Sequence, residues 1–299
     1  MHRRFLALAL SFAALGACGT RLCAFDIFDY SAVTHERFSS GFPSAPVVNS
    51  SFFLSGYDLS GIGWTGGNFG VTLISPRHFL TAAHVSTGAT VSFLSTGGTV
   101  RTYTVDSSYT VEHSAGVNTD LQLVRLSAAI APGDQVNYYS TLLLNSTTDY
   151  LGLTVVAFGS GQRAGTNTID EAGVTNMLPF GGPADGTLDN VIFTTDYDAV
   201  TGQTQGAPGD SGSPTFVAVG GSLALIGTHS AIVDATPDKT IDVLVPAYYS
   251  QINTRLGLDG YTFGAFVAIP EPSAWAAVIG VFVFAAAWQR ARRNQKPKD

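Results

Sequence analysis

Short runs of β-forming residues, separated by glycine-rich turns, fill the middle of this chain and constrain its fold more than any other feature. The runs occupy residues 69–74, 90–94, 100–105, 121–126, 153–158, 190–195, 215–219, 223–228 and 240–245. Glycine pairs at 66–67, 97–98, 181–182 and 220–221 supply turn residues that tolerate positive φ. Such spacing predicts an antiparallel barrel or sandwich. One helix is predicted in the body, over residues 245–256, with Pro246 in its first turn.

Charge and cysteine content narrow the class of protein further. Residues 25–266 hold seven basic and 20 acidic residues, a formal charge of −13, which would repel a phosphate backbone. Nucleic acid is therefore not expected as a partner. Both cysteines, Cys18 and Cys23, lie near the N-terminus, so no disulfide can hold the body together. A hydrophobic core must do so, and 45% of the residues are hydrophobic.

The N-terminal 24 residues have the pattern of an export signal. Arg3 and Arg4 form a basic start, residues 5–17 are apolar, and small residues follow. The mature chain is then expected to begin near Phe25. An alternative is that residues 15–18 form a lipoprotein cleavage box, which would leave a lipidated Cys18 at the new N-terminus.

The C-terminal segment 267–299 combines an apolar run with a basic end. Residues 274–288 are almost wholly apolar, residues 269–273 read Ile-Pro-Glu-Pro-Ser, and Arg290, Arg292 and Arg293 follow the run. At about 1.5 Å per residue the run is short for a membrane span, although flanking residues could extend it into a separate hydrophobic helix. A simple tail anchor is one interpretation. The order of features resembles the PEP-CTERM sorting tail of Gram-negative bacteria, which implies processing by an exosortase and delivery to the cell surface, outer envelope or extracellular matrix.

A serine stands inside a tight turn with the sequence Gly209-Asp210-Ser211-Gly212. A nucleophilic serine needs an exposed hydroxyl and backbone amides that point at the oxygen on which negative charge develops. Gly209 can turn its amide inward because no side chain obstructs it. Gly209 and Ser211 are therefore predicted to form an oxyanion hole. The same residue types also make ordinary turns in β proteins.

A histidine and an aspartate earlier in the chain complete a candidate triad. His84 follows small residues, and its unperturbed pKa of about 6.5 would let its imidazole accept a proton near neutral pH. Asp120 begins the apolar run 121–126, where its carboxylate can anchor one imidazole nitrogen. Taken singly, His84 could be a packed histidine and Asp120 a turn cap. Together with Ser211 they predict acyl-transfer chemistry.

The chain order His, Asp, Ser differs from the orders found in subtilisins and α/β-hydrolases. Segments 81–84, 119–121 and 209–214 resemble the signature regions of trypsin-like serine proteases, and the resemblance extends over about residues 51–256. It implies an all-β fold of two six-stranded antiparallel β-barrels, with the active site in the cleft between them and a short C-terminal helix. It also implies hydrolysis of a protein or peptide substrate through an acyl-enzyme.

The chain departs from that family at its N-terminal side. No activation sequence of the Ile-Val-Gly-Gly type follows a basic residue, which leaves the partner of Asp210 open. Residues 25–46 are either a propeptide or an extension before a protease domain at 47–266. The disulfides of animal members are missing, which makes disulfide-poor bacterial members the closer comparison.

Three further residues are expected to contact substrate. By family spacing, Gln205 should lie near the base of the pocket for the residue before the cut, where a preference for Arg or Lys would need a carboxylate. Segment 226–231, which contains His229 and Ser230, resembles the substrate-binding strand. A histidine at the position of His229 occurs in bacterial glutamyl endopeptidases, where it pairs with an acidic side chain; a neutral histidine packed beneath the pocket is the alternative. We therefore expect cleavage after Glu or a small residue.

No cofactor and no metal are assigned. Asp185, Asp189, Asp196 and Asp198 do not form a compact calcium loop, and the remaining histidines lack metal-ligand spacing. Two rival functions stay open from the sequence. One is a catalytically inactive, trypsin-fold surface binding module, and the other is an extracellular matrix protein whose tail is its main functional feature.

Overall fold

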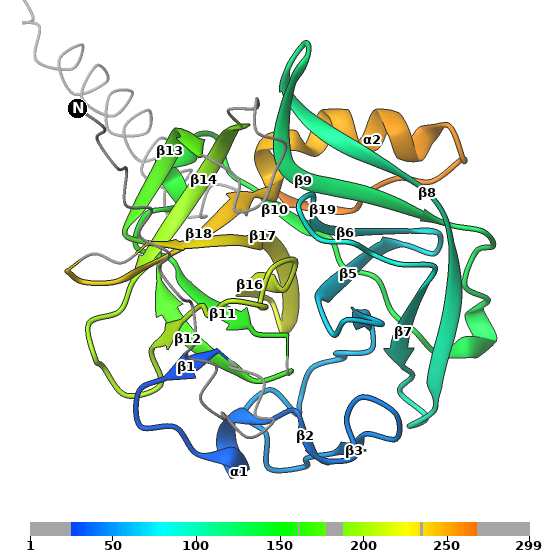
Figure 1. Cartoon of the computed structure of the whole chain (residues 1–299), viewed down its shortest axis with the longest axis horizontal. Coiled ribbons are helices and arrows are strands. Elements are labelled where there is room, and N and C mark those ends of the chain that lie inside the picture. The colour runs from blue at the N-terminus through cyan, green and yellow to red at the C-terminus, as the bar shows by residue number, and fades with distance from the viewer. Residues whose placement is uncertain (1–24, 161, 178–187, 234–235, 268–299) are drawn as a thin grey trace, which may run out of the picture.

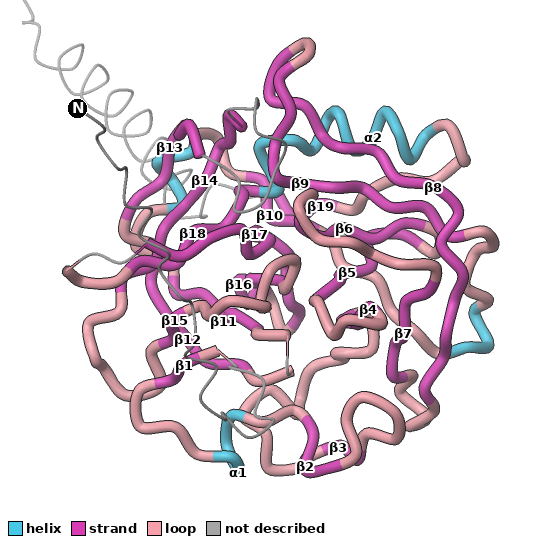
Figure 2. The backbone as a smooth tube through the Cα atoms, viewed as in Figure 1, coloured by secondary structure: helices cyan, strands magenta, loops and turns pink. Residues whose placement is uncertain are grey.

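The structure is a computed structural model of the chain, and it describes residues 25–160, 162–177, 188–233 and 236–267. Strands make up 48% of the described backbone and are its main regular structure (Figure 2). The described helical elements are α1 (Ala32–His35), α2 (Tyr249–Gly257) and the short 3-10 turns η1 (Pro132–Asp134), η2 (Thr147–Tyr150) and η3 (Val245–Tyr248). The predicted signal segment lies outside the described residues, and so does the predicted sorting tail with its hydrophobic helix, apart from its first residue, Val267. Within the ranges given above, no helix has the length and apolar character needed to cross a membrane.

Six strands form a closed antiparallel barrel, seen on the right of Figure 1. Their order around the barrel is β4 (Ile62–Thr65), β5 (Gly70–Ser75), β6 (His78–Ala82), β9 (Val117–Leu126), β8 (Val100–Ser114) and β7 (Thr90–Leu94). Alternate residues of a strand point to opposite faces of a sheet. Val71 and Leu73 of β5 accordingly join one buried cluster, with Val124 and Leu126 of β9. This cluster forms the interior of the barrel.

The second sheet has nine strands. Its main path runs through β12 (Ala164–Thr168), β11 (Thr154–Phe158), β16 (Pro214–Val219), β17 (Ser222–Val233), β18 (Lys239–Leu244), β14 (Leu188–Asp196) and β13 (Glu171–Met177). Two short strands, β10 (Thr141–Leu143) and β19 (Ala265–Val267), pair beside that path.

This second sheet differs from the predicted six-stranded barrel. In the described part of the chain, no pairing joins β12 to β13 and closes the path. The extra strands come from the length of β17, because one of its edges accepts β10 at Leu225 and β18 from Gly227 onward. One closed six-stranded barrel and one larger sheet therefore replace the two equal barrels expected from the sequence.

Apolar side chains from both sheets and from α2 form a common core. It contains Leu121 and Leu123 of β9, Phe216 of β16, and Ile252 and Leu256 of α2. The predicted helix over residues 245–256 is divided in the structure, because η3 carries Pro246 and the regular helix starts only at Tyr249. The core joins the barrel to the second sheet without any disulfide.

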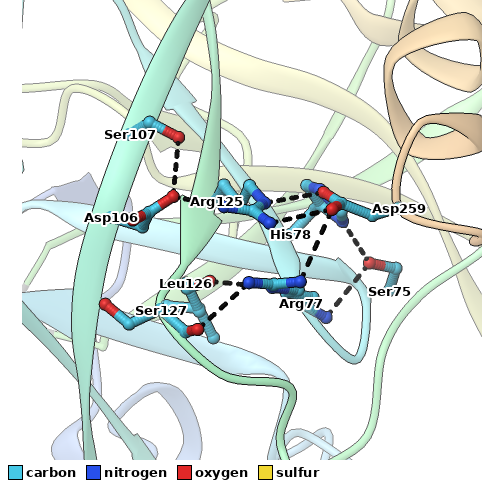
Figure 3. Close-up of polar contacts among 9 residues, drawn as sticks. All are labelled: Ser75, Arg77, His78, Asp106, Ser107, Arg125, Leu126, Ser127 and Asp259. Carbon is cyan, nitrogen blue, oxygen red and sulfur yellow. Dashed lines mark hydrogen bonds and ion pairs between the residues drawn. The ribbon is translucent and has the colours of Figure 1, made fainter.

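An ionic cluster fixes the chain just after α2 to the barrel (Figure 3). The Asp259 carboxylate accepts hydrogen bonds from Arg125 Nε at 2.7 Å and Arg125 Nη2 at 2.9 Å. His78 Nε2 lies 3.0 Å from the same carboxylate, and Arg77 approaches it at 3.4 Å. Because three barrel side chains converge on one residue, the position of the C-terminal helix is set by charge as well as by packing.

The chain before the barrel packs against both sheets. Strand β1 (Asp26–Ile27) pairs with β15 (Thr204–Gln205), and β2 (Phe38–Ser40) pairs with β3 (Val47–Val48). The Arg37 guanidinium between them is buried and donates to the carbonyls of Ile62 and Leu59 and to the Gln162 side chain. Residues 25–48 are thus built into the fold.

Candidate active site

Pairing between β6 and β9 brings His84 next to Asp120. Ala82 of β6 is the register partner of Leu121 in β9, and the Ala83 amide donates to the Asp120 carbonyl at 3.1 Å. His84 follows two residues after β6 ends, so it lies beside the carboxylate. The local sequence of small residues at 82 and 83 leaves room for this approach.

The three predicted residues form a continuous hydrogen-bonded chain. His84 Nδ1 lies 2.8 Å and 2.9 Å from the two Asp120 carboxylate oxygens, and His84 Nε2 lies 2.8 Å from Ser211 Oγ. Since an ionised carboxylate only accepts, Nδ1 must carry the proton that it donates. Nε2 is then the acceptor for the Ser211 hydroxyl. This is the tautomer needed for a histidine that removes a proton from serine.

Two side chains of the second sheet hold Asp120 in place. The Ser230 hydroxyl donates to Asp120 Oδ2 through a short hydrogen bond, and the Asp120 amide donates to Asn190 Oδ1 at 2.8 Å. Asp120 and Asn190 are both buried. Ser230 was expected only as a pocket residue, and Asn190 was missed. No sequence signal marks Asn190, because it lies 70 positions from its partner.

The backbone around Ser211 leaves two amides available. Gly209 has φ of 103°, a conformation that a residue with a side chain rarely adopts. The amides of Asp210, Gly212 and Ser213 donate to the carbonyls of Ala207, His229 and Asp210 at 2.9–3.0 Å. Among the described residues, the amides of Gly209 and Ser211 have no such acceptor. Both can therefore bind an oxyanion at Ser211.

A cavity of about 190 Å³ adjoins the serine. The residues that line it come from both sheets and are His84, Ala207, Pro208, Gly209, Ser211, His229, Ser230, Ala231 and Ile232. Gln205 is not among them, because it lies in β15 opposite Asp26. The wall is mainly apolar and contains no carboxylate.

His229 forms a second buried histidine–carboxylate pair at this cavity. Its Nδ1 lies 3.1 Å from Asp242 Oδ1, and Thr215 donates a short hydrogen bond to the other carboxylate oxygen. Burial favours the neutral ring, but the hydrogen bond and charge of Asp242, with the charges of Asp210 and Asp120, outweigh it and raise the pKa of His229. The protonated ring is therefore favoured more than that of a free histidine.

In the ranges that the structure describes, no three His, Cys, Asp or Glu side chains gather closely enough to hold a metal ion. What the arrangement can perform with its own residues is proton transfer from a hydroxyl to an imidazole beside two free amides.

Comparison with known proteins agrees with this geometry. No curated protein matches the sequence at a significant level. The sequence matches the family described as Trypsin over residues 62–253, which is more than half of its 299 residues. That range includes β4 to β18, most of α2, and all three residues of the hydrogen-bonded chain. The chain therefore belongs to the trypsin family, whose members are serine-type peptidases.

Proposed function

We propose that this protein is an exported serine endopeptidase that hydrolyses peptide bonds with His84, Asp120 and Ser211. The observation that carries the proposal is the unbroken chain from the Asp120 carboxylate through His84 to the Ser211 hydroxyl. Membership of the trypsin family supports a peptidase, and the two free amides beside Ser211 support acyl transfer. Because this hydrogen-bonded chain is intact, an enzyme is favoured over an inactive binding module or a matrix protein.

In the proposed reaction, Ser211 Oγ attacks the substrate carbonyl while its proton moves to His84 Nε2. The Asp120 carboxylate stabilises the imidazolium, and the amides of Gly209 and Ser211 donate to the oxyanion. Collapse of this intermediate breaks the C–N bond, and His84 gives the proton to the leaving amine. Water then attacks the acyl-enzyme with His84 again as the base, which releases the acid and restores Ser211.

We propose that the residue before the cut is acidic or small. The cavity beside Ser211 is small, and its described wall has no carboxylate to bind Arg or Lys. The His229 ring is part of that wall, and its Nδ1 is occupied by Asp242. A protonated ring would leave Nε2–H to donate to a carboxylate of the substrate.

Export and sorting are proposed from the sequence alone. Residues 1–24 would direct the chain across the inner membrane, with a lipidated Cys18 as the alternative outcome. The tail at 267–299 would be recognised by an exosortase after transient anchoring and would deliver the enzyme to the cell surface or matrix. Intact mass measurement of the protein from its native host tests both ends at once. A mass that still contains both segments would contradict the proposal.

Labelling with a fluorophosphonate probe tests the nucleophile. Attack by Ser211 Oγ on phosphorus would displace fluoride and leave a stable adduct, which mass spectrometry can locate. We expect labelling at Ser211 in the full chain and none in Ser211→Ala. An unlabelled but folded wild-type protein would overturn the proposal and favour a binding module. A library of peptides then tests specificity, and faster cleavage after Arg or Lys than after Glu or Ala would refute the proposed preference.

A further inference from the structure

Asp210 is a buried carboxylate beside the nucleophile for which the proposed reaction gives no task. It lies between the two residues that present free amides, and it is 0% exposed. Burial of an ionised carboxylate is costly unless hydrogen-bond donors compensate. The identity of those donors therefore indicates what holds this part of the site.

The donors to Asp210 come from the neighbouring loop and from Ser160. Asp210 Oδ1 accepts from the Ser160 amide at 2.9 Å and from Ser160 Oγ at 3.1 Å, and Oδ2 accepts from the Ala207 amide at 2.8 Å. In the described part of the chain, no cationic side chain forms an ion pair with it. Burial raises the pKa of Asp210 above its ordinary value, and the charge of His229 and these three hydrogen bonds only oppose that rise.

These contacts connect the turn with the two free amides to the loop that follows β11. Ser160 follows β11 by two residues, and Asp210 lies directly between Gly209 and Ser211. The Ser213 amide donates to the Asp210 carbonyl at 3.0 Å, which tightens the same turn. The turn that carries the two free amides is therefore tied to Ser160 through the carboxylate of its central residue, Asp210.

The N-terminal segment covers the contact between Ser160 and the Asp210 carboxylate. Phe25 is 1% exposed, and a Cβ added at Gly159 would lie 2.5 Å from Phe25 Cβ and 2.9 Å from Asp210 Oδ1. Arg163 donates to the Phe25 carbonyl at 3.1 Å and binds the Glu36 carboxylate at 2.8 Å. Residues 25–36 are therefore attached at both ends to the loop that carries Ser160.

We propose that Ser160 is a positioning residue that holds the Asp210 carboxylate and thereby aims the amides of Gly209 and Ser211, with residues 25–37 retained as its cover in the active enzyme. This inference rests on the proposed function. It assigns to a serine hydroxyl and two backbone amides the task of stabilising the buried carboxylate. No new chain terminus produced by cleavage within residues 25–46 is then required for activity.

The test compares Ser160→Ala with Ser160→Thr, which restores the hydroxyl, in the full chain. Loss of one hydrogen bond to the carboxylate is expected to lower kcat about tenfold with little change in KM, and Ser160→Thr should recover most of the loss. Ser213→Ala is the matched control, because the Ser213 hydroxyl is buried nearby and has no partner among the described residues.

A second readout separates aiming of the amides from general loss of structure. Sulfur accepts hydrogen bonds more weakly than oxygen, so the ratio of rates for an ester and its thiono analogue reports how well the amides meet the oxyanion. Ser160→Ala should lower this ratio, and Ser213→Ala should not. Should Ser160→Ala fail to fold, Ser160→Cys replaces it with the same two outcomes.

The N-terminus of the active species completes the experiment. Protein that carries the fluorophosphonate adduct should retain residues 25–37 in its intact mass. An unchanged kcat and ester ratio in Ser160→Ala, or an adduct on chains that lack residues 25–37, would overturn this inference while Ser211 is still labelled. Absence of labelling in the wild type would instead overturn the proposed function.

Discussion

Replacing Asp120 by asparagine should cost most of the activity while leaving the fold intact. Asp120 Oδ1 accepts from the His84 amide at 3.0 Å, and Oδ2 accepts from His84 Nδ1 at 2.8 Å. An asparagine can offer an oxygen to only one of these donors. If its oxygen faces the His84 amide, its NH2 group faces Nδ1 and stabilises the tautomer with the proton on Nε2. That tautomer cannot accept the Ser211 proton.

The size of the loss follows from the alternatives open to Asp120→Asn. The opposite amide orientation would keep the useful tautomer, but it would leave the part-buried His84 amide without an acceptor, at about 1–3 kcal/mol. That cost alone reduces the productive form by about 5- to 150-fold. The variant also lacks the negative charge that stabilises the imidazolium. From the loss of the productive tautomer and the loss of the charge together, we expect kcat/KM to fall about 10⁴-fold, which is the size found for the same change in a triad of this type.

The assay is the rate of acylation by an activated ester, measured with the thermal unfolding temperature of each variant. Asp259→Asn is the control, because Asp259 also accepts from a buried histidine, His78, but outside the site (Figure 3). It should change kcat/KM less than twofold. A loss below tenfold in Asp120→Asn, or equal losses in the two variants, would refute the reasoning.

Three further outcomes are expected. Ile252→Ala should lower the free energy of unfolding by about 2–5 kcal/mol, because Ile252 is fully buried in the common core. Urea denaturation measures this loss. A loss below about 1 kcal/mol, which is typical of a surface substitution, would contradict the prediction. Burial lowers the pKa of His78 from 6.5, so the unfolded chain binds the proton more readily and the free energy of unfolding should fall as pH drops below 6.5. This dependence of the free energy of unfolding on pH should be weaker in His78→Gln. Equal dependence in the two proteins would count against the prediction. The pKa of His229 is raised above 6.5, so the preference for Glu before the cut should hold to a higher pH than a free histidine would allow, and it should disappear as pH rises through that pKa. A Glu-to-Ala rate ratio that is constant with pH would argue for a neutral ring.

Much of the strand framework could be predicted because its signals are local. Each predicted run overlaps a strand of the structure, and residues 90–94 coincide with β7. The strands that the sequence did not reveal are short or polar, such as β12 with the sequence Ala-Gly-Thr-Asn-Thr. Their pairing depends on neighbours distant in the chain, and so does the number of strands that β17 collects.

Some residues of the candidate site are likewise indicated by the local sequence, and others are not. His84, Asp120 and Ser211 stand in short segments whose residue types indicate their chemistry, and the structure brings them together. Ser160 lies 50 positions from Asp210, and no motif surrounds it. Counting back from Ser211 suggested Gln205 as a pocket residue, but Gln205 pairs with Asp26, and the lining of the cavity begins two residues later at Ala207. Such contacts depend on tertiary structure rather than on spacing.

The division of the three hydrogen-bonded residues between the two sheets determines when, during synthesis, they can meet. His84 and Asp120 belong to the barrel, whereas Ser211 and the supporting Ser230 belong to the later sheet. A ribosome completes the last barrel strand, which ends at Leu126, 85 residues before it reaches Ser211 (211 − 126 = 85). Strand β18 and helix α2, which close the common core, come later still. His84, Asp120 and Ser211 therefore cannot meet in their final geometry until nearly the whole domain has been made.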